Sequence, residues 1–396
     1  MQLTKKRKFA AAQPRAAANS RATVAGSLMA AALALPGVVA TPSAKAESVP
    51  EKTTIGIKYL NYAEKQESGK RMRVKSPSIF MLAPIKDKYS IEGSFVLDSV
   101  SGASPTSYNS LSGASGKGIR DYRKAGDLKL TRFFDRAAIG VGFAGSREHD
   151  YDSDAVSVDG RFSTANNNTT FAGGIGYSGD KIGSSNNRTL DERRRTTDAL
   201  VGITQVLTPN DLIQSNLTVS VGKGYFSDPY KDFDKRPDSR TSWAWLTRYN
   251  HYFAAPAAAL HTSYRYFRSD WGVSAHTVET AWYQPLGSGW LLRPSLRYYT
   301  QRAARFYRDP LPPPSLPLDF LTASTNTHFS ADTRLAAFGA VTLGMKVAKE
   351  FAHDWTIDLK YEWYQQRSAW RLGGDGSPGM ENFTAKWWQI GISKKF

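Results

Sequence analysis

The sequence of 396 residues contains no cysteine. Disulfides and thiolate metal sites are therefore excluded, which suits an exported protein but identifies no function. After residue 46 no run of 18 consecutive apolar residues occurs, so the rest of the chain offers no transmembrane helix. The mean hydropathy of −0.44 still permits a membrane β-barrel, because barrel strands alternate apolar and polar side chains. The 10 Trp, 19 Tyr and 19 Phe fit aromatic girdles at two membrane interfaces.

The N-terminus has the features of an export signal. The basic cluster Lys5–Lys8 precedes an apolar stretch of small residues from Ala22 to Ala40, and Ala44-Lys45-Ala46 offers a cleavage site. We expect residues 1–46 to be a signal peptide and residues 47–396 to be the mature domain; a retained membrane anchor is the alternative. Cleavage would remove seven Lys or Arg and no acidic residue, lowering the net charge from +17 to +10. The basic residues form no clustered face, so we expect no nucleic-acid binding.

The clearest strand pattern begins at Trp355. One side of this segment carries Trp355, Ile357, Leu359, Tyr361 and Trp363, and the other carries Thr356, Asp358, Lys360 and Glu362. A period of two is typical of a β-strand. An apolar row with Trp at both ends is typical of a strand that faces lipid and is anchored at both interfaces. The charged row is then expected to face a polar, water-filled lumen.

The last residue, Phe396, ends a second alternating strand. Trp388, Ile390, Ile392 and Phe396 share one side, and Lys394 stands at an apolar position near the rim, where a lysine can reach the headgroups. An exposed edge strand with such an apolar face would be a liability in water, whereas closing a barrel in lipid uses both its edge and its face. We therefore predict that these residues form the closing strand and the signal for the barrel assembly machinery.

Turn residues divide the chain into hairpins. Short breaks occur at 84–87, 133–136, 166–168, 208–211, 254–256, 285–288 and 352–354, and longer polar breaks cover about 99–123, 223–241, 302–330 and 368–382. With both termini in the periplasm, these turns imply about 16 strands, within about two. The predicted fold is an all-β, transmembrane, antiparallel, porin-like barrel with long extracellular loops and short periplasmic turns. The alternative, a soluble β-sandwich, is disfavoured because about 350 residues exceed one sandwich core.

Several stretches of the chain resemble one bacterial family. They are Ser99–Pro105, Gly202–Asp211, Gly222–Lys231, Arg236–Asp238, Asp270–Val273, Arg297–Gln301 and Gly376–Gly379. On these stretches the sequence resembles the DUF3570 family of exported proteins of unknown function. The resemblance implies an outer-membrane barrel, and it implies no substrate and no catalytic residues. Two segments at the starts of long loops, Ser101–Pro105 and Tyr225–Tyr230, are candidates for inward-folded constrictions, with simple loop structure as the alternative.

The polar sides of the strands supply the candidate functional residues. The predicted lumen-facing set is Arg248, Arg265, Arg293, Arg297, Arg334, Lys346 and Lys360, together with Glu279, Asp358 and Glu362. A cationic wall would lower the free energy of anions inside the pore, which predicts a mild anion preference. The alternative is a charge ladder, in which cations and carboxylates pair across neighbouring strands and leave little field.

Two further motifs are weak. Gly140–Gly145 matches the dinucleotide-binding fingerprint as a string, but it lies within a strand-like run rather than between a strand and a helix. Asp150, Asp152 and Asp154 are spaced as in a calcium loop, but the glycine and the bidentate glutamate of that loop are missing. An acidic loop tip is the expected structure, and weak binding of divalent ions is the alternative.

Histidine and serine occur close together at two places in the sequence. His276 follows Ser274 and His261 precedes Ser263, but no nucleophile motif accompanies either pair. We therefore expect no enzyme activity, no cofactor and no metal site.

The predicted function is passage of small hydrophilic solutes or ions across the outer membrane of a Gram-negative bacterium, through a lumen narrowed by outer loops. The alternative is a plugged barrel that acts as a surface receptor or as the membrane sleeve of an export or electron-transfer assembly. Expected partners are outer-membrane lipid, the assembly machinery and the solutes, besides an unidentified periplasmic or surface protein.

Overall fold

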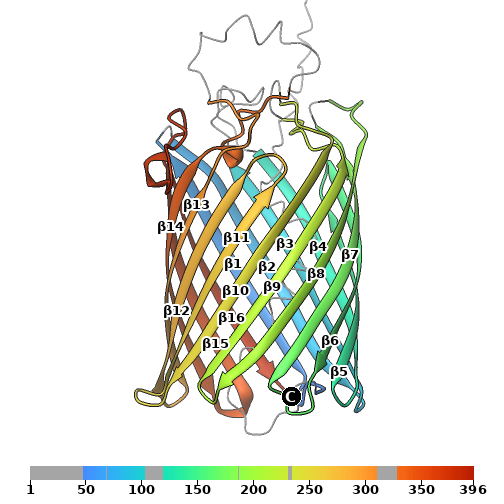
Figure 1. Ribbon diagram of the computed structural model, residues 1–396, viewed down its shortest axis with the longest axis vertical. Helices are drawn as coiled ribbons and strands as arrows, with labels where there is room; N and C mark the ends of the chain where they lie inside the picture. The colour runs from blue at the N-terminus through green and yellow to red at the C-terminus, as the bar shows by residue number, and fades with distance from the viewer. Residues whose placement is uncertain (1–47, 68, 103–118, 186, 231–233, 310–327) are drawn as a thin grey trace, which may run out of the picture.

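The computed structural model describes residues 48–67, 69–102, 119–185, 187–230, 234–309 and 328–396. The described residues form sixteen strands: β1 (Thr54–Gln66), β2 (Gly69–Ile85), β3 (Tyr89–Gly102), β4 (Ile119–Phe133), β5 (Ala137–Arg147), β6 (Tyr151–Ser163), β7 (Thr169–Ile182), β8 (Glu192–Thr208), β9 (Asp211–Gly224), β10 (Ser239–Phe253), β11 (Ala258–Ser269), β12 (Ser274–Gly287), β13 (Trp290–Gln301), β14 (Phe338–Phe351), β15 (Trp355–Arg367) and β16 (Phe383–Lys395). Each strand pairs antiparallel with its neighbours in sequence, and β16 pairs with β1, so the sheet closes into a barrel (Figure 1). The predicted fold class and strand number are confirmed.

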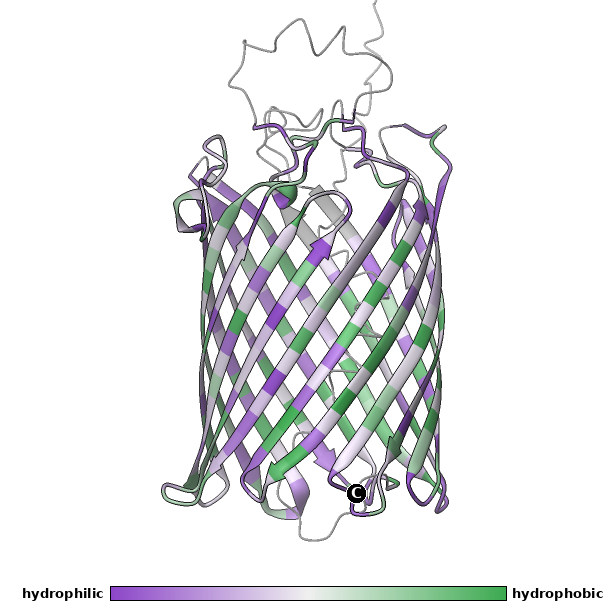
Figure 2. Cartoon of the chain, in the orientation of Figure 1, coloured by the Kyte–Doolittle hydropathy of each residue, from purple (hydrophilic) through white to green (hydrophobic). Residues whose placement is uncertain are grey.

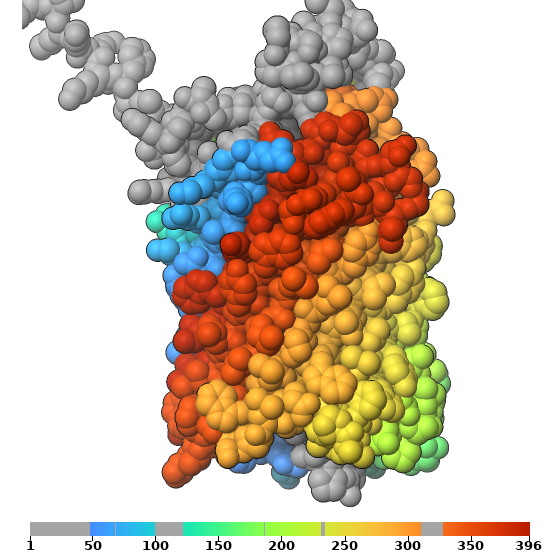
Figure 3. All heavy atoms as spheres, turned by 90° about the vertical axis from the view of Figure 1, so that its left-hand side faces the viewer, coloured from blue at the N-terminus to red at the C-terminus, as the bar shows by residue number. Residues whose placement is uncertain are grey.

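The seam between the two ends of the chain closes the barrel. β1 and β16 pair along their whole length, from Thr54 opposite Lys395 to Gln66 opposite Phe383. The amide of Phe396 extends the ladder by donating to Thr53 O over 2.8 Å. Figure 3 shows the red end of the chain running beside the blue beginning at this seam. Closure satisfies the backbone groups of both edge strands, which lipid could not do.

Seven tight turns gather at one end of the barrel, where the C-terminus also lies (Figure 1). They join β2 to β3, β4 to β5, β6 to β7, β8 to β9, β10 to β11, β12 to β13 and β14 to β15. Each coincides with one of the seven short breaks expected from the sequence. The last contains the short 3₁₀ segment η2 (Ala352–Asp354), where His353 adopts φ = 62°. This end is the periplasmic end by the rule that barrels keep short turns on that side.

The connections at the opposite end differ widely in length. Those after β3, β9, β13 and β15 are the long breaks predicted from the sequence. The connections after β1, β5 and β11 are as tight as the periplasmic turns, so the expected alternation of short and long breaks is incomplete. These three hairpins leave few residues to cover the mouth. Any narrowing of the lumen therefore depends on the long connections.

Side chains alternate between lipid and lumen along each strand. On β15 the outward residues Ile357 and Leu359 are 39% and 52% exposed. The charged residues that alternate with the outward residues of this strand are half-buried on the lumen side. Figure 2 shows the same alternation of green and purple along other strands. Among the described residues no helix is long and apolar enough to cross a bilayer. Because the lumen side of the strands is polar, the barrel interior contains no packed apolar core along the described strands.

The main buried apolar cluster lies instead at the outer mouth. It contains Trp271, Val273, Ala304, Phe306, Tyr307, Leu335, Ala336, Phe338, Ala340 and Met380, with Phe226, Phe267, Tyr299, Ala303 and Tyr364 packed against it. These residues come from the ends of strands and from the β9–β10, β11–β12, β13–β14 and β15–β16 connections. The cluster therefore fixes long connections against the inner wall.

Candidate channel lumen and constriction

The β13–β14 connection folds back into the mouth of the barrel. Its described parts, residues 302–309 and 328–337, pack against Trp271 of the β11–β12 connection. The rings of Trp271 and Phe306 meet edge to face at 5.3 Å, a favoured geometry for aromatic pairs. Leu335, within the 3₁₀ segment η1 (Thr333–Leu335), is only 7% exposed in the same cluster. Apolar burial therefore holds this connection inside the rim.

The β9–β10 connection lies beside it. Lys235 and Phe329 exchange two backbone hydrogen bonds of 2.8 Å and form an isolated antiparallel bridge. We call residues 225–230, 234–238, 302–309 and 328–337 together the constriction. The Tyr225–Tyr230 segment, a candidate constriction from sequence, lies within it, whereas residues 103–105 of the other candidate lie outside the described residues.

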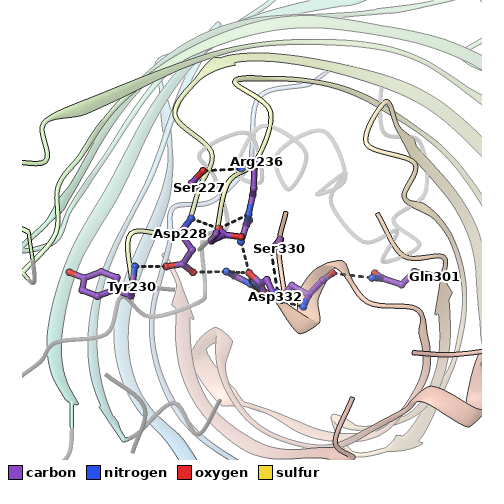
Figure 4. Close-up of polar contacts among 9 residues, drawn as sticks. Ser227, Asp228, Tyr230, Arg236, Gln301, Ser330 and Asp332 are labelled. Atoms are coloured by element: carbon purple, nitrogen blue, oxygen red, sulfur yellow. Dashed lines mark hydrogen bonds and ion pairs between the residues drawn. The ribbon is translucent and has the colours of Figure 1, made fainter. Parts of the chain in front are cut away.

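Five charged side chains join the two connections. Arg236 Nη2 lies 2.7 Å from Asp332 Oδ2, and Arg236 Nε lies 2.9 Å from Asp234 Oδ2. Arg334 Nη2 lies 2.8 Å from Asp228 Oδ2, and Arg334 also forms a close ion pair with Asp332. Figure 4 shows these contacts between the two connections. We call these five residues the ion cluster.

The ion cluster is charged because its members support one another. Asp228, Asp234 and Asp332 have side chains at most 9% exposed. Burial alone would lower the pKa of Arg334, but Asp332 and Asp228 raise it above its usual value. Burial likewise opposes the charge of Arg236, and Asp332 and Asp234 raise its pKa. Loss of one partner would leave an uncompensated buried charge, which costs about 3 to 5 kcal/mol.

Hydrogen bonds extend from the ion cluster to the β5–β6 and β7–β8 connections on one side and to β13 on the other. Tyr230, 4% exposed, receives a 2.9 Å bond from the amide of Ser185 at its hydroxyl and forms a close hydrogen bond to Asp150. On another side Gln301 Nε2 donates to Arg334 O over 3.0 Å. Figure 4 shows Tyr230 and Gln301 at opposite ends of the network. The constriction therefore spans part of the mouth and is fixed at both ends.

Arg334 differs from its predicted position. The sequence pattern placed it on the strand that contains Lys346, but β14 begins only at Phe338. Asp332 caps η1, since its side chain accepts a hydrogen bond from the amide of Arg334. Arg334 therefore belongs to the ion cluster in the mouth rather than to the strand wall.

Part of the predicted lumen set forms ion pairs across the wall. Lys346 Nζ lies 3.2 Å from Asp358 Oδ1, and Lys360 forms a close pair with Glu362 on the same strand. These four residues correspond to the charge-ladder alternative. Their opposite charges leave little net field on β14 and β15.

The arginines of β10 to β13 lie in a different environment. Arg265 stacks over Phe267 with 5.2 Å from guanidinium to ring centroid, and Arg293 stacks over Tyr283 at 4.9 Å. Arg297 is exposed to the lumen and lies opposite Glu279 in the strand register. Glu279 also interacts electrostatically with Arg248. A single carboxylate thus lies near two guanidinium groups.

The two sides of the lumen differ in charge. On β10 to β13 the described lumen-facing cations are Arg240, Arg248, Arg265, Arg293 and Arg297, against Glu279, while Lys346 of β14 is paired with Asp358. On β3 to β6 the described lumen-facing charges are Glu92, Asp98, Asp127 and Asp159 against Arg123, Lys129 and Arg161. Two of these cations form ion pairs there, with Asp98 and Asp159. We call the wall from β10 to β13 the cationic wall.

The closing-strand residues face outward. Trp388, Ile390, Ile392 and Phe396 are between 40% and 60% exposed on the lipid side. Lys394 Nζ lies 4.7 Å from the centroid of Phe396 and 5.1 Å from that of Trp355. Such cation–π contacts at the rim let the lysine cover apolar rings while its ammonium reaches water.

The acidic and glycine motifs have structural roles. Asp154 pairs with Arg147 at 2.6 Å on the outer side of β5 and β6, while Asp150 bonds to Tyr230 in the mouth. The three aspartates therefore do not converge, and within the described ranges no group of three metal-binding side chains occurs. Gly140–Gly145 lies inside β5, so the helix that a dinucleotide fingerprint needs is replaced by strand.

The two histidines that precede or follow serine point in opposite directions. His276 Nδ1 is 2.7 Å from the hydroxyl of Tyr264 on the exposed outer face. His261 faces the lumen, where its ring lies 4.3 Å from that of Tyr283. A serine nucleophile needs an adjacent base that is oriented by a carboxylate, whereas the partner of His276 Nδ1 is the hydroxyl of Tyr264.

A closed, sixteen-stranded antiparallel barrel with an apolar outside and a charged lumen defines a porin-like outer-membrane protein. The model of the family described as "Protein of unknown function (DUF3570)" matches residues 25–191 and 184–387. The chain therefore belongs to the DUF3570 family, as the resemblance of its motifs implied. A search of curated proteins found no match.

Solved outer-membrane proteins share the architecture at low sequence identity. A bacterial polysaccharide outer membrane secretin matches with a TM-score of 0.50 and 9% identity over 87% of this chain and 98% of that chain. CdiB from Acinetobacter baumannii matches with a TM-score of 0.50 and 7% identity over 86% of this chain and 60% of that chain. OccK9 from Pseudomonas aeruginosa has a TM-score of 0.43 and 7% identity over 87% and 98%. At these identities the first two likenesses establish the fold alone.

Proposed function

We propose that this protein is an outer-membrane channel through which small hydrophilic solutes and ions pass, with a preference for anions. The observation that carries the proposal is the cationic wall of β10 to β13, where five arginines lie with one carboxylate on the lumen side. A charge in a narrow lumen with low-dielectric walls acts on passing ions more strongly than a surface charge does. The lumen of a barrel of this strand number is wide enough for water and solutes.

A liposome-swelling assay tests this proposal. Liposomes containing the protein are diluted into isotonic solutions of small sugars or small organic anions of graded size. Swelling should be fastest for small anions and should fall off at a size set by the constriction. Liposomes that swell no faster than protein-free ones would reject the channel.

The proposed chain of events begins with export. Residues 1–46 are proposed to be cleaved as a signal peptide, after which residues 47–396 assemble in the Gram-negative outer membrane through the closing strand. The outward face of β16 is apolar and is the surface proposed to be bound by the assembly machinery; it carries Trp388, Ile390, Ile392 and Phe396. N-terminal sequencing of the membrane form, with Glu47 as the expected first residue, tests the cleavage.

The constriction favours a second candidate function. A mouth held by an apolar cluster and a buried ion cluster suits a plugged barrel that serves as a surface receptor or as the sleeve of a larger assembly. Such a barrel would conduct only when a partner displaces the constriction. Swelling that appears only after the ion cluster is disrupted would favour this function over an open channel.

A further inference from the structure

Four aromatic side chains lie on the lumen side of the wall at similar distances along their strands, two of them, Tyr299 and Tyr364, directly beneath the apolar cluster of the mouth. Tyr299, Tyr364, Trp387 and Tyr62 lie eight or nine residues from the periplasmic ends of β13, β15, β16 and β1. They face inward, because residues of the opposite parity on the same four strands, Leu296, Tyr361, Trp388 and Ile57, are 40% to 55% exposed on the outer side. Tyr62 and Trp387 are paired in register, with ring centroids 5.9 Å apart. We call these four rings the aromatic belt.

The polar tips of the belt are tied to the wall. Tyr364 donates to Gln366 over 2.6 Å, Trp387 Nε1 donates to Glu362 over 2.7 Å, and Tyr62 donates to Glu64 over 2.5 Å. These three rings are therefore held in one orientation before any ligand binds. Side chains that are already ordered lose less entropy on binding, so the belt is preorganised.

Two guanidinium groups continue the belt along the cationic wall. Arg297 and Arg265 both lie seven residues from the periplasmic ends of β13 and β11. In the part of the chain that the structure describes, neither lies within ion-pair distance of a carboxylate. A carboxylate that entered the lumen could pair with either guanidinium through two parallel hydrogen bonds.

We propose that the belt and these two arginines bind an acidic oligosaccharide. This inference rests on the proposed channel function and names its substrate class. The ring faces would stack on the C–H faces of sugar rings, and the guanidinium groups would pair with uronate carboxylates. From β11 to β1 the wall covers six strand spacings of about 4.8 Å, or about 29 Å, which is longer than one sugar ring.

Neighbouring acceptors support a hydroxyl-rich ligand over a phosphate. Glu362 and Glu64 bond to belt side chains, and Glu279 lies opposite Arg297. Their carboxylates, and the amide oxygen of Gln366, accept hydrogen bonds from hydroxyl groups. A phosphate ion, in contrast, has no ring face to stack on the belt. The stacking surfaces, the acceptors and the two guanidinium groups together suit a ligand with sugar rings, many hydroxyl groups and spaced carboxylates.

Binding of trigalacturonate to the full-length protein tests the inference. Maltotriose serves as the uncharged probe of similar size, and inorganic phosphate as the anion without sugar rings. Affinity is measured by calorimetry in detergent, where no open pore is needed, and block of single-channel current is measured in planar bilayers. We expect saturable binding and current block by trigalacturonate, weaker binding of maltotriose, and no competition by equimolar phosphate.

Two matched pairs of variants assign the effect to the belt. Trp387→Leu should weaken trigalacturonate binding at least tenfold, whereas Trp388→Leu, which changes the adjacent outward tryptophan, should leave it unchanged. Arg297→Gln should weaken trigalacturonate tenfold and maltotriose little, whereas Arg268→Gln, at an exposed position on β11, should affect neither. If Trp387→Leu does not fold, Tyr364→Ala replaces it, with Tyr364→Phe as the variant that keeps the ring.

The outcomes separate this inference from the channel proposal. If trigalacturonate binds in detergent in a way that depends on Trp387 but no channel steps are seen, the channel proposal is rejected and the proposed binding site on the aromatic belt stands. If channel steps are seen without trigalacturonate binding, or if phosphate displaces trigalacturonate, the proposed binding site is overturned and the channel proposal stands. Equal loss of affinity in Trp387→Leu and Trp388→Leu would also overturn it.

Discussion

Arg334 and Asp228 lie 106 residues apart in the sequence, yet Arg334 Nη2 is 2.8 Å from Asp228 Oδ2. The pair joins the β13–β14 connection to the β9–β10 connection across the mouth of the barrel. Arg236 and Asp332 repeat this join at 2.7 Å in the opposite sense, with the arginine on the β9–β10 side. Because each connection supplies both a cation and a carboxylate, the two connections are held together as a unit.

Loss of Arg236 should loosen the constriction. Its side chain is 10% exposed, and Arg236→Gln leaves the buried Asp234 without its cation, at a cost of about 3 kcal/mol, while Asp332 keeps Arg334 as its partner. We expect a larger or noisier single-channel conductance and earlier proteolysis of residues 225–238. Arg308→Gln, an exposed residue of the same constriction, is the control. Unchanged conductance and proteolysis in Arg236→Gln would show that the ion cluster does not hold the mouth.

Replacing Arg293 and Arg297 together with Gln should reduce anion preference. A unit charge about 4 Å from an ion contributes about 1 kcal/mol even in bulk water, or about fivefold in local ion concentration. The reversal potential in a tenfold salt gradient should therefore move toward zero. Replacing Lys346 and Asp358 together with Gln and Asn removes a paired cation and anion and should move it little. An unchanged reversal potential in the double arginine variant would show that these arginines do not set the ion preference of the pore.

Deletion of Phe396 should impair assembly more than stability. The residue makes one ladder hydrogen bond and one contact with Lys394, so the assembled barrel should lose about 1 kcal/mol. The closing strand would, however, lose the terminal aromatic proposed to be bound during insertion. We expect less protein in the outer membrane, measured by fractionation, at equal synthesis. Phe351→Leu, an outward aromatic at the same end, is the control, and equal amounts of both variants in the membrane would refute the role of the C-terminus.

The folded protein should migrate differently from the boiled protein in cold detergent gels. Sixteen strands in a continuous antiparallel ladder must break together, because opening any one pair exposes two edges to lipid or detergent. A closed barrel therefore stays compact in dodecyl sulfate until it is heated. Identical mobility before and after boiling would contradict closure.

The barrel could be predicted from sequence because its signals are local. Each of the seven periplasmic turns carries its own Pro, Gly, Asn or Asp signal, and the parity of β15 can be read from Trp355 to Trp363 alone. Lumen-facing Lys360 and lipid-facing Leu359 follow from that parity without knowledge of the partner strands. The strand number followed from the turns, even though three outer connections proved short.

The constriction could be predicted only in part, because its contacts are between distant segments. The Tyr225–Tyr230 segment can be singled out from sequence because it lies at the start of a long loop. Nothing near it in sequence, however, indicates Arg334 as the partner of Asp228. Arg334 also continued the alternation of β14, and only the capping by Asp332 removes it from the strand. The pairing of Lys346 with Asp358 likewise depends on register, which the sequence of a single strand does not contain.

Single-channel recording of the purified protein in a planar bilayer, under a tenfold gradient of potassium chloride, tests the account most directly. It predicts stable conductance steps whose reversal potential shows chloride passing more readily than potassium. A membrane that contains folded protein and shows no steps, or steps that favour potassium, would contradict it.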